Sequence, residues 1–470
     1  MIERDQIFIN GTWRKSSGDG VIPVINPVTE EPVATIPAGN ADDVDRAAQA
    51  AADAFPEWSR TSVDERVEVL EKLARLTEKY ADEITRAIVS EIGQPERIAK
   101  TAQTAIAVQD FMTLAGSLRT MTWDEQVGPT LVSREAAGVI AAITPWNAPM
   151  HMVCMKVGSA LAAGCTVVLK GTEVAPLSSF IFAEIAEEAG LPGGVFNLVS
   201  GTGTEVGEPM VTHPLVDMIS ITGSVRAGRR VMELASRSVK RVALELGGKS
   251  ANVILEDADL ELAINDGIED AFRNSGQVCG GLSRVLVPRA RLAEAEEIAV
   301  RKAQSYVMGD PFDPATTLGP VANATQRERV REYIRSGTAD GARLLTGGPE
   351  APHGLDRGYF VQPTVFSGDN SMRVAREEIF GPVVVIIPYE DETDAFRIAN
   401  DTEYGLAGAI WAADADRARA AARNLRTGRI RINGSPLNQR APHGGFKLSG
   451  IGREFGRYGI EEFLEYKSIG

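Results

Sequence analysis

The sequence predicts an α/β protein with two doubly wound open sheets, and three observations support this fold class. The chain has 470 residues, more than a single hydrophobic core usually serves. Short apolar runs alternate with helical patterns over residues 138–244, and a second series of the same kind covers residues 251–412. Repeated βα units with short links form open, mostly parallel sheets that carry helices on both faces. We place the boundary between the two sheets near residues 247–248.

The segment before the first series predicts short strands followed by helices. Asn-Gly and Pro within residues 5–37 predict turns that separate short strands. An alanine-rich pattern predicts a helix over residues 41–58, and a capping box opens a long amphipathic helix over residues 63–92. A further helix is expected over residues 97–118.

The two βα series supply most of the remaining elements. Strands are expected at residues 138–143, 166–169, 195–199, 216–221, 242–244, 251–255, 284–287, 383–387 and 407–412. Helices are expected at residues 176–189, 227–237, 293–306, 326–336, 393–400 and 416–425. Ligands of such sheets bind beyond the carboxyl ends of the strands, so functional side chains are expected there. Residues 120–137 and the C-terminal tail read as accessory strands, and an exposed strand edge invites pairing with another subunit.

The composition argues against several classes of function. A net charge of −15 argues against a nucleic-acid partner and against binding to anionic membranes. The three cysteines and four histidines lack the spacing of a disulfide framework or a zinc site, so no metal is expected. No N-terminal signal pattern is expected, and the most apolar stretch, residues 149–169, is interrupted by a histidine, a lysine and glycines. A cytoplasmic protein without a membrane partner is the expectation.

One cysteine stands in a setting that favours chemistry. Cys279 follows an amphipathic run over residues 260–272 and has glycines and small polar residues around it. Glycine lets backbone and ligand approach the sulfur closely, whereas an inert core cysteine more often has aliphatic neighbours. On these residues alone, a structural thiol and a nucleophile both stay open.

A carboxylate interrupts an apolar strand. Glu245 lies within residues 241–250, which read as a short apolar strand that ends in a glycine pair. An acid in such a strand is costly to ionise, which raises its pKa and suits it to general-base work. An edge-strand glutamate that faces water is the alternative.

The motifs Glu245-Leu-Gly-Gly-Lys and Gly276-Gln-Val-Cys279 together resemble the two active-site signatures of the aldehyde dehydrogenase superfamily. Residues 442–454 also follow the pattern of that family, with His443 in place of phenylalanine. The resemblance runs from about Phe8 to the C-terminus. It implies an aldehyde-dehydrogenase-like fold with a dinucleotide-binding domain (1–119 and 137–247), a catalytic domain (248–447) and oligomerisation strands (120–136 and 448–470) that build a homodimer or homotetramer.

The resemblance also implies a reaction, the oxidation of an aldehyde to a free carboxylic acid. Cys279 would attack the aldehyde to give a thiohemiacetal, and Glu245 would activate the water that cleaves the later thioester. Asn147, in a Pro-Trp-Asn element, would stabilise the oxyanion together with the backbone N–H of Cys279. Lys156 matches a family lysine near the active site. Without the family, Asn147 reads as part of a turn and Lys156 as a surface residue.

The same resemblance assigns an NAD site. Lys170 and Glu173 would contact the adenosine ribose, and the Glu173 carboxylate would repel the 2′-phosphate of NADP, which stays an alternative cofactor. Residues 221–224 end a strand and open a helix, which suits a phosphate. A glycine-rich loop at residues 201–207 and a solvated helix end at Glu377–Glu378 are the plainer readings of two further segments. The expected cofactor contacts are Ile143, Thr144, Pro145, Trp146, Lys170, Glu173, Gly203, Gly207, Thr222, Gly223, Ser224, Leu246, Gly247, Glu378 and Phe380.

The substrate is expected to be a medium-sized aldehyde of apolar or aromatic character. The positions that the family places along its tunnel are mainly apolar, namely Phe111, Met112, Met150, Val278, Gly280, Leu437, Asn438 and Phe446. No arginine is assigned to a substrate carboxylate, although Arg440 lies nearby in the sequence. Other functions stay open: a semialdehyde-specific dehydrogenase, or a cysteine hydrolase or acyltransferase without a redox cofactor. A non-catalytic protein on this scaffold is disfavoured because Cys279 and Glu245 are both present.

Overall fold

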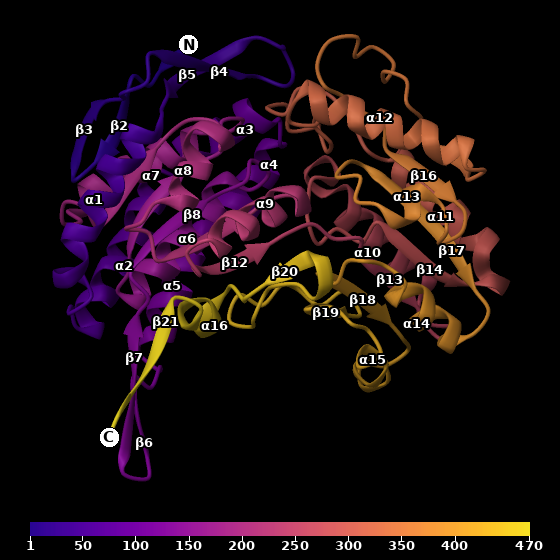
Figure 1. The fold of residues 1–470 in the computed structure, drawn as a ribbon. Coiled ribbons are helices and arrows are strands. Elements are labelled where there is room, and N and C mark those ends of the chain that lie inside the picture. Colours follow the sequence, from indigo (N-terminus) through magenta and orange to yellow (C-terminus); the bar gives the residue numbers. More distant parts are fainter.

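The computed structural model describes residues 1–470 and contains the two expected open sheets side by side (Figure 1). The first sheet has the strand order β20-β12-β11-β8-β9-β10-β2-β3, and the second has the order β15-β16-β17-β14-β13-β18-β19. The fold class predicted from the sequence is therefore confirmed.

Parallel strands form the centre of both sheets. In the first sheet they are β8 (Val139–Ile143), β9 (Thr166–Lys170), β10 (Phe196–Val199), β11 (Met218–Thr222) and β12 (Arg241–Glu245), with the antiparallel strands β2 (Gln6–Ile9), β3 (Thr12–Lys15) and β20 (Gly450–Ile451) at the edges. In the second sheet they are β13 (Ala251–Ile254), β14 (Arg284–Pro288), β16 (Thr364–Ser367), β17 (Val383–Tyr389), β18 (Ala407–Trp411) and β19 (Arg429–Ile432), with β15 (Arg343–Thr346) antiparallel at one edge. Three four-residue strands at or next to the edges of the second sheet, β15, β16 and β19, were not predicted from the sequence.

Helices cover both faces of each sheet. They are α1 (Ala41–Trp58), α2 (Val63–Lys79), α3 (Ala81–Ile92), α4 (Glu96–Ala99), α5 (Ala105–Leu118), α6 (Pro149–Ala163), α7 (Leu177–Ala189), α8 (Glu208–Thr212), α9 (Val225–Ser236), α10 (Leu260–Phe272), α11 (Leu292–Gln304), α12 (Ala324–Ala339), α13 (Arg373–Arg376), α14 (Glu392–Asn400), α15 (Ala415–Ala422) and α16 (Gly456–Glu461). Val139 and Ala141 pack with α1 and α9, whereas Ile140 and Ala142 pack in the separate cluster that contains α5, α6 and α7. Successive residues of a strand point to opposite faces of the sheet, so β8 contributes side chains to two separate hydrophobic cores.

The helix predicted over residues 63–92 is wrong in one respect, because the chain breaks at Tyr80. This residue has φ −89° and ψ 8°, and it ends α2 and begins α3. The Tyr80 hydroxyl donates to Glu188 of α7 at 2.9 Å, and the Lys79 ammonium binds the same carboxylate at 2.6 Å. This tertiary contact holds the chain at the break, and no local periodicity reports it.

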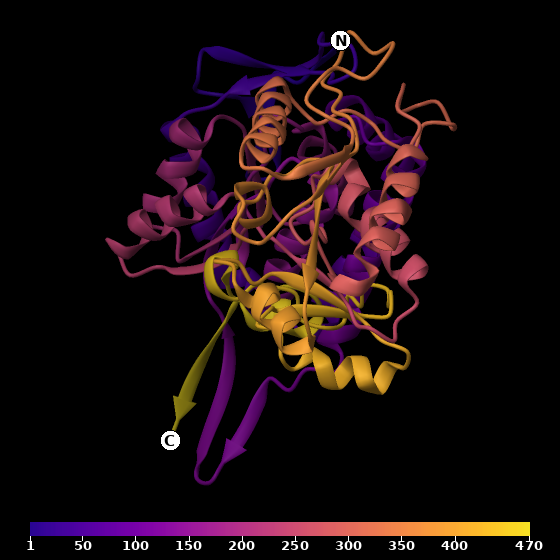
Figure 2. The same ribbon diagram turned by 90° about the vertical axis from the view of Figure 1, so that its right-hand side faces the viewer.

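A three-stranded antiparallel sheet projects from the body as an arm (Figures 1 and 2). The C-terminal strand β21 (Leu464–Ile469) pairs with β7 (Thr130–Ala136), which pairs with β6 (Asp124–Val127). The two accessory segments expected from the sequence thus meet in one sheet. A further small sheet contains β1 (Ile2–Glu3), β5 (Pro32–Ala38) and β4 (Gly20–Ile25).

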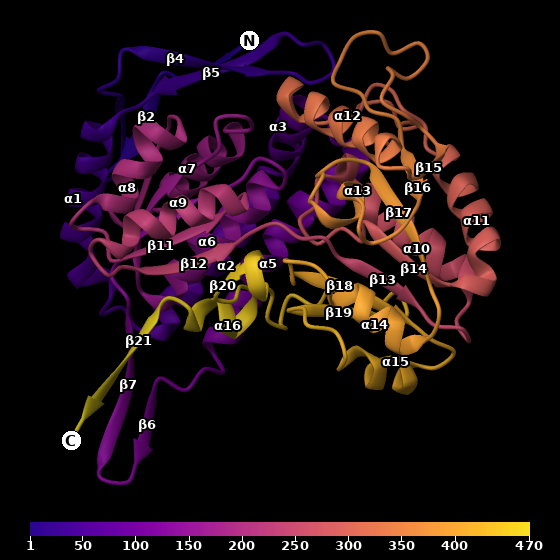
Figure 3. The same cartoon turned by 45° about the vertical axis from the view of Figure 1, so that its right-hand side comes forward.

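The two large sheets are joined through residues 246–250, which run from the end of β12 to the start of β13 (Figure 3). The carboxyl end of a first-sheet strand therefore lies close along the chain to the amino end of a second-sheet strand. None of the helices combines the length and the apolar character needed to cross a membrane.

Candidate active site

Loops from both sheets meet where the chain passes from one sheet to the other. Residues 144–147 follow β8, and Glu245 is the last residue of β12. From the second sheet, Cys279 precedes β14, and Glu378 precedes β17. The site thus lies beyond the carboxyl ends of the first sheet, as the sequence analysis expected, and before the amino ends of the second.

The loop that carries Cys279 is held in an unusual conformation. Asn274, Ser275 and Gly276 have φ values of 51°, 56° and 74°. A side chain at Gly276 would overlap the backbone of Gly381, so glycine is required at this close approach. The buried Gln277 side chain ties the loop down, because its Nε2 donates to Asn274 O at 2.9 Å and its Oε1 accepts from Ala322 N at 2.8 Å.

The three cysteines differ in exposure. Cys154 and Cys165 are buried, whereas Cys279 is partly exposed. Its surroundings nevertheless raise the pKa of the thiol to about 12, through burial first and then through the negative charges of Glu245 and Glu378. The sulfur is therefore a thiol at neutral pH in the free chain, and it lies beside two carboxyl groups rather than in a packed aliphatic core.

Asn147 lies against the cysteine loop. Its Nδ2 donates to Gln277 O at 2.9 Å, and its backbone carbonyl accepts from Gln103 Nε2 and from Asn274 Nδ2, both at 3.0 Å. These bonds orient the side-chain amide, which carries a second N–H in addition to the one that binds Gln277. This arrangement is more than a simple turn, because two side chains and one backbone carbonyl position Asn147.

Glu245 is buried, and the reading of it as a water-facing edge residue is wrong. β12 is flanked by β11 on one side and β20 on the other, and neither carboxylate oxygen of Glu245 has a hydrogen-bond partner. Burial and then the charge of Glu454 raise the pKa of Glu245 well above its ordinary value. The expectation of a raised pKa in an apolar strand is thus confirmed.

His443 and Lys156 both lie near Glu245. His443 Nε2 is 3.7 Å from Glu245 Oε2, and the ring stacks on Phe455 with centroids 5.0 Å apart. Lys156 is buried rather than exposed; its Nζ binds Glu454 at 2.7 Å and Ser220 Oγ at 3.1 Å. The sequence analysis gave no role to Glu454, although this residue lies in a quoted motif.

The residues expected to bind the adenosine half of a dinucleotide lie at the ends of first-sheet strands. Lys170, at the end of β9, places its Nζ 3.1 Å from Glu173 Oε2. A side chain at Gly207 would come within 3.8 Å of Lys170 Cδ, and the segment Gly203–Gly207 is a π-helical turn that leads into α8. This places the glycine-rich loop beside Lys170.

The turn between β11 and α9 has the expected strand-to-helix form. Ser224 caps α9, because its Oγ accepts from Ala227 N at 3.2 Å, and the Thr222 hydroxyl is buried without a partner. Gly223 N donates to Glu245 O at 3.0 Å, which joins this turn to the end of β12. The next residue, Leu246, packs against Gly228 of α9. An unpaired hydroxyl beside a helix N-terminus suits a phosphate.

Glu377 and Glu378 have different surroundings. Glu377 is exposed and accepts from the Tyr333 hydroxyl at 2.7 Å, so the solvated reading is right for this residue. Glu378 turns inward, where its Oε1 accepts from Gly248 N at 3.1 Å, and burial raises its pKa to about 7. A side chain at Gly247 would overlap the Glu378 carboxylate.

The aromatic contact beside Glu378 links the two sheets. Phe380 has φ 62°, and its ring meets the edge of Trp146 with centroids 5.4 Å apart and planes at 85°. Thr144 N donates to Lys170 O at 3.2 Å, so the loop that continues β8 through Ile143, Thr144 and Pro145 is fastened to β9. The loop after β8 and the loop before β17 thus meet at this aromatic contact.

The expected tunnel positions do not share one environment. Phe111 and Met150 are fully buried, and Phe111 stacks on Phe182 at 6.1 Å, so these two residues lie in the packed core. Their assignment to an open tunnel is wrong, because helices α5 and α6 pack closely there. Met112, Leu437 and Phe446 are exposed.

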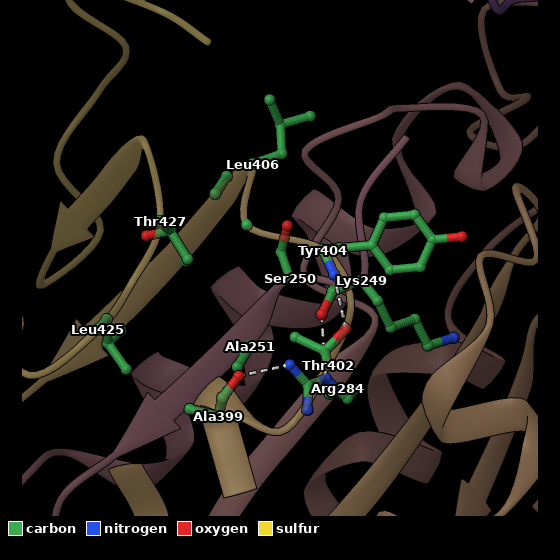
Figure 4. A pocket seen from close by; sticks show the side chains of 13 residues that line it. Lys249, Ser250, Ala251, Arg284, Ala399, Thr402, Tyr404, Leu406, Leu425 and Thr427 are labelled. Atoms are coloured by element: carbon green, nitrogen blue, oxygen red, sulfur yellow. Dashed lines mark hydrogen bonds between the residues drawn. The ribbon is translucent and has the colours of Figure 1, made fainter. Parts of the chain in front are cut away.

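A small cavity lies behind the glycine pair (Figure 4). Its volume of about 10 Å³ is the size of one water molecule. Lys249 lines it and is buried with no partner for its Nζ, and burial lowers the pKa of this lysine to about 7. Figure 4 shows Lys249 and Tyr404 on one wall, with Arg284 below them. The cavity is too small for an organic substrate.

The raised pKa of Cys279 predicts how its reactivity depends on pH. Alkylation of the free chain by iodoacetamide is expected to accelerate about tenfold per pH unit between pH 7 and 10, since only the thiolate reacts. Mass spectrometry of the Cys279 peptide gives the rate. A rate that is already flat above pH 8 would show a thiolate at neutral pH and would contradict the raised pKa.

Comparison with known proteins agrees with this geometry. The model of the aldehyde dehydrogenase family matches residues 13–469. The 3-succinoylsemialdehyde-pyridine dehydrogenase of a Pseudomonas species is 49% identical over 466 residues, which cover 99% of this chain and 98% of that protein. Among solved structures, aldehyde dehydrogenase C of Pseudomonas syringae, a mutant complexed with NAD+ and octanal, has a TM-score of 0.98 and 46% identity, with 99% of this chain and 96% of that chain covered. The Mycobacterium tuberculosis aldehyde dehydrogenase complexed with NAD+ has a TM-score of 0.97 and 41% identity, with 100% and 98% covered. The chain therefore belongs to the aldehyde dehydrogenase family, and it is an oxidoreductase that oxidises an aldehyde.

Proposed function

We propose that this chain converts an aldehyde to a free carboxylic acid with NAD+, using Cys279 as the nucleophile and Glu245 as the base. One observation carries the proposal. A partly exposed thiol and a buried carboxyl group without partners meet in the crevice between two sheets. Both groups have raised pKa values. The thiol can carry out the addition to the aldehyde, and the carboxyl group can act in the later hydrolysis.

The first half of the reaction is addition of the thiol to the aldehyde. The partly exposed Cys279 thiol gives its proton to water, its sulfur bonds to the carbonyl carbon, and the carbonyl oxygen takes up negative charge. Asn147 supports this charge with the side-chain N–H that does not bind Gln277, together with the backbone N–H of Cys279. The oxygen and sulfur then belong to a thiohemiacetal on Cys279.

The residues around the crevice fit a dinucleotide. The unpaired Thr222 hydroxyl and the N-terminus of α9 suit a phosphate, the Lys170–Glu173 pair suits the ribose hydroxyls, and Glu378 suits the second ribose. Bound NAD+ supplies an acceptor for the hydride that leaves the thiohemiacetal carbon, which becomes a thioester. The Glu173 carboxylate favours NAD over NADP.

The remaining cofactor assignments complete the walls of this site. Gly247 leaves room beside the Glu378 carboxylate, and Phe380 and Trp146 form an aromatic corner next to it. Ile143, Thr144, Pro145, Gly203, Gly207, Gly223, Ser224 and Leu246 supply the backbone and apolar surface. The glycines allow the ligand to approach the backbone closely.

The second half of the reaction is hydrolysis of the thioester. Glu245 takes a proton from water, the water oxygen bonds to the acyl carbon, and the carbon–sulfur bond breaks to release the acid and Cys279. Lys156 and Glu454 form an ion pair within this buried region, and the charge of Glu454 keeps the pKa of Glu245 high. A base placed in this way favours the free acid over transfer to a second thiol.

We further propose an organisation for the chain around this site. Residues 1–119 and 137–247 act as the dinucleotide-binding domain, residues 248–447 as the catalytic domain, and residues 120–136 and 448–470 as the elements of a homodimer or homotetramer. The arm supports the assembly, because Val127, Tyr466 and Ile469 expose large apolar surfaces on its strands. Three free cysteines suit a reducing compartment, the cytoplasm.

Two substitutions separate the halves of the reaction. Cys279→Ala is expected to abolish aldehyde oxidation, whereas Glu245→Gln retains one rapid burst of reduced cofactor and then slows at least about a hundredfold, because the thioester is not released. Stopped-flow absorbance of the reduced cofactor measures both. Cys154→Ala, which removes a buried thiol outside the site, serves as the control. Turnover in Cys279→Ala, or an unchanged steady state in Glu245→Gln, would refute the assignment.

The arm predicts a variant with altered assembly. Tyr466→Glu combined with Ile469→Glu places charges on the exposed apolar surface of β21, and the protein is expected to become a monomer. Light scattering after size-exclusion chromatography measures the mass, and Val307→Glu, on an exposed apolar residue outside the arm, is the matched control. An unchanged mass in the double variant, or a monomeric parent protein, would remove the role proposed for the arm.

A further inference from the structure

Arg429 is a charged side chain without a partner beside the reactive cysteine. It is the first residue of β19 and only partly exposed. No hydrogen bond or ion pair forms to its guanidinium, and its Nε is fully buried. A charge taken out of water without a counter-charge is costly, so such a group is normally paired.

The guanidinium points at the loop that carries Cys279. A side chain at Gly280, the residue after the cysteine, would come within 3.3 Å of Arg429 Nη2. The absence of a side chain at Gly280 thus leaves space that the arginine occupies. The positive charge of Arg429 acts to lower the pKa of the Cys279 thiol against the larger effect of burial, so it lies within electrostatic reach of the sulfur.

The neighbouring carboxylates are already used by other groups. Asp270 lies 3.3 Å from Arg431 and 3.7 Å from Arg273, and it also accepts from Leu282 N at 3.2 Å. Asp266 binds Arg431 at 2.9 Å. Arg431 and Arg273 therefore pair with these two carboxylates, and Arg429 is left without a contact.

The other titratable groups near Arg429 do not neutralise it. Burial and then the charge of Arg429 lower the pKa of His443 to about 3, so this histidine is neutral. Glu245 forms no ion pair with Arg429, and neither of its carboxylate oxygens has a hydrogen-bond partner. Neither group therefore pairs with the Arg429 guanidinium, which lies beside the cysteine loop.

Lys249 is the other unpaired buried cation in this region, and its position differs. It is fully buried, and it lines the water-sized cavity behind the glycine pair, where no substrate fits (Figure 4). Arg429, in contrast, borders the loop whose cysteine is partly exposed. Only the arginine is placed to meet a ligand that has reached the sulfur.

We infer that Arg429 binds a carboxylate of the substrate, so the preferred substrate is an aldehyde that also carries a carboxylate, a semialdehyde of a dicarboxylic acid. The inference rests on the proposed function, because it names the substrate of that site. The planar guanidinium offers paired N–H donors that match the two oxygens of a carboxylate. Arrival of the anion supplies the counter-charge that the buried arginine lacks. A carboxylate-bearing substrate replaces the expected apolar or aromatic aldehyde, because an aldehyde of that kind would have no contact for Arg429.

Matched pairs of aldehydes test the inference. In the parent enzyme, kcat/KM is expected to be at least about tenfold higher for adipate semialdehyde than for hexanal, or for para-carboxybenzaldehyde than for benzaldehyde. Arg429→Gln is expected to remove this preference, by raising KM for the carboxylate-bearing aldehyde at least about tenfold more than KM for its neutral partner, while Arg429→Lys retains part of the preference. Arg426→Gln, at an exposed arginine on the same segment, keeps the preference.

A second measurement does not require turnover. Adipate is expected to protect Cys279 from alkylation in the parent protein and not in Arg429→Gln, whereas hexanol protects neither. Protection by adipate in an enzyme that oxidises no aldehyde would support the carboxylate site and refute the proposed reaction.

Two results would overturn the role of Arg429. One is equal kcat/KM for both members of each pair in the parent enzyme. The other is an Arg429→Gln variant that oxidises neutral and charged aldehydes equally slowly and whose Cys279 is alkylated only at higher pH. The role of the guanidinium would then be to lower the pKa of the thiol.

Discussion

The close passage of the backbone at Gly247–Gly248 is the constraint on which the site depends. A side chain at Gly247 would overlap the Glu378 carboxylate, and one at Gly248 would lie 2.6 Å from Cys279 O. Gly248 N instead donates to Glu378 at 3.1 Å, and Ser449 Oγ donates to Gly247 O at 2.7 Å. Because neither glycine has a positive φ, space and not backbone conformation excludes larger residues here. The pair lets the end of β12 lie against the cysteine loop.

The titratable groups of the crevice are buried, and burial is the main cause of their shifted pKa values. Burial raises the pKa values of Cys279, Glu245 and Glu378, and it lowers those of Arg429 and His443. Burial favours the neutral form of each of these groups, unless a ligand supplies a counter-charge. Groups of this kind are costly in a folded protein and are typical of sites that bind charged ligands and transfer protons.

Much of the fold follows from local patterns in the chain. The parallel strands β8 to β14 are apolar runs that alternate with helical patterns. Earlier in the chain, Asn40 caps α1 and Ser62 caps α2. Packing between distant segments accounts for the failures. The break at Tyr80 is held by Glu188, which is 108 residues away in the sequence. Phe111 belongs to the core because α5 packs on α6, a fact that its place in a family motif does not convey.

The sequence alone was enough to propose the reacting groups, because Cys279 and Glu245 lie in motifs that resemble the two active-site signatures of the family. Only the tertiary structure distinguished Glu378 from Glu377, brought His443 beside Glu245, and left Arg429 unpaired next to Gly280. The physical reason is that burial and counter-charges are properties of the assembled neighbourhood. Residues 280 and 429 are neighbours only because β18 and β19 pair and bring the start of β19 under the cysteine loop. No pattern within either segment contains that contact.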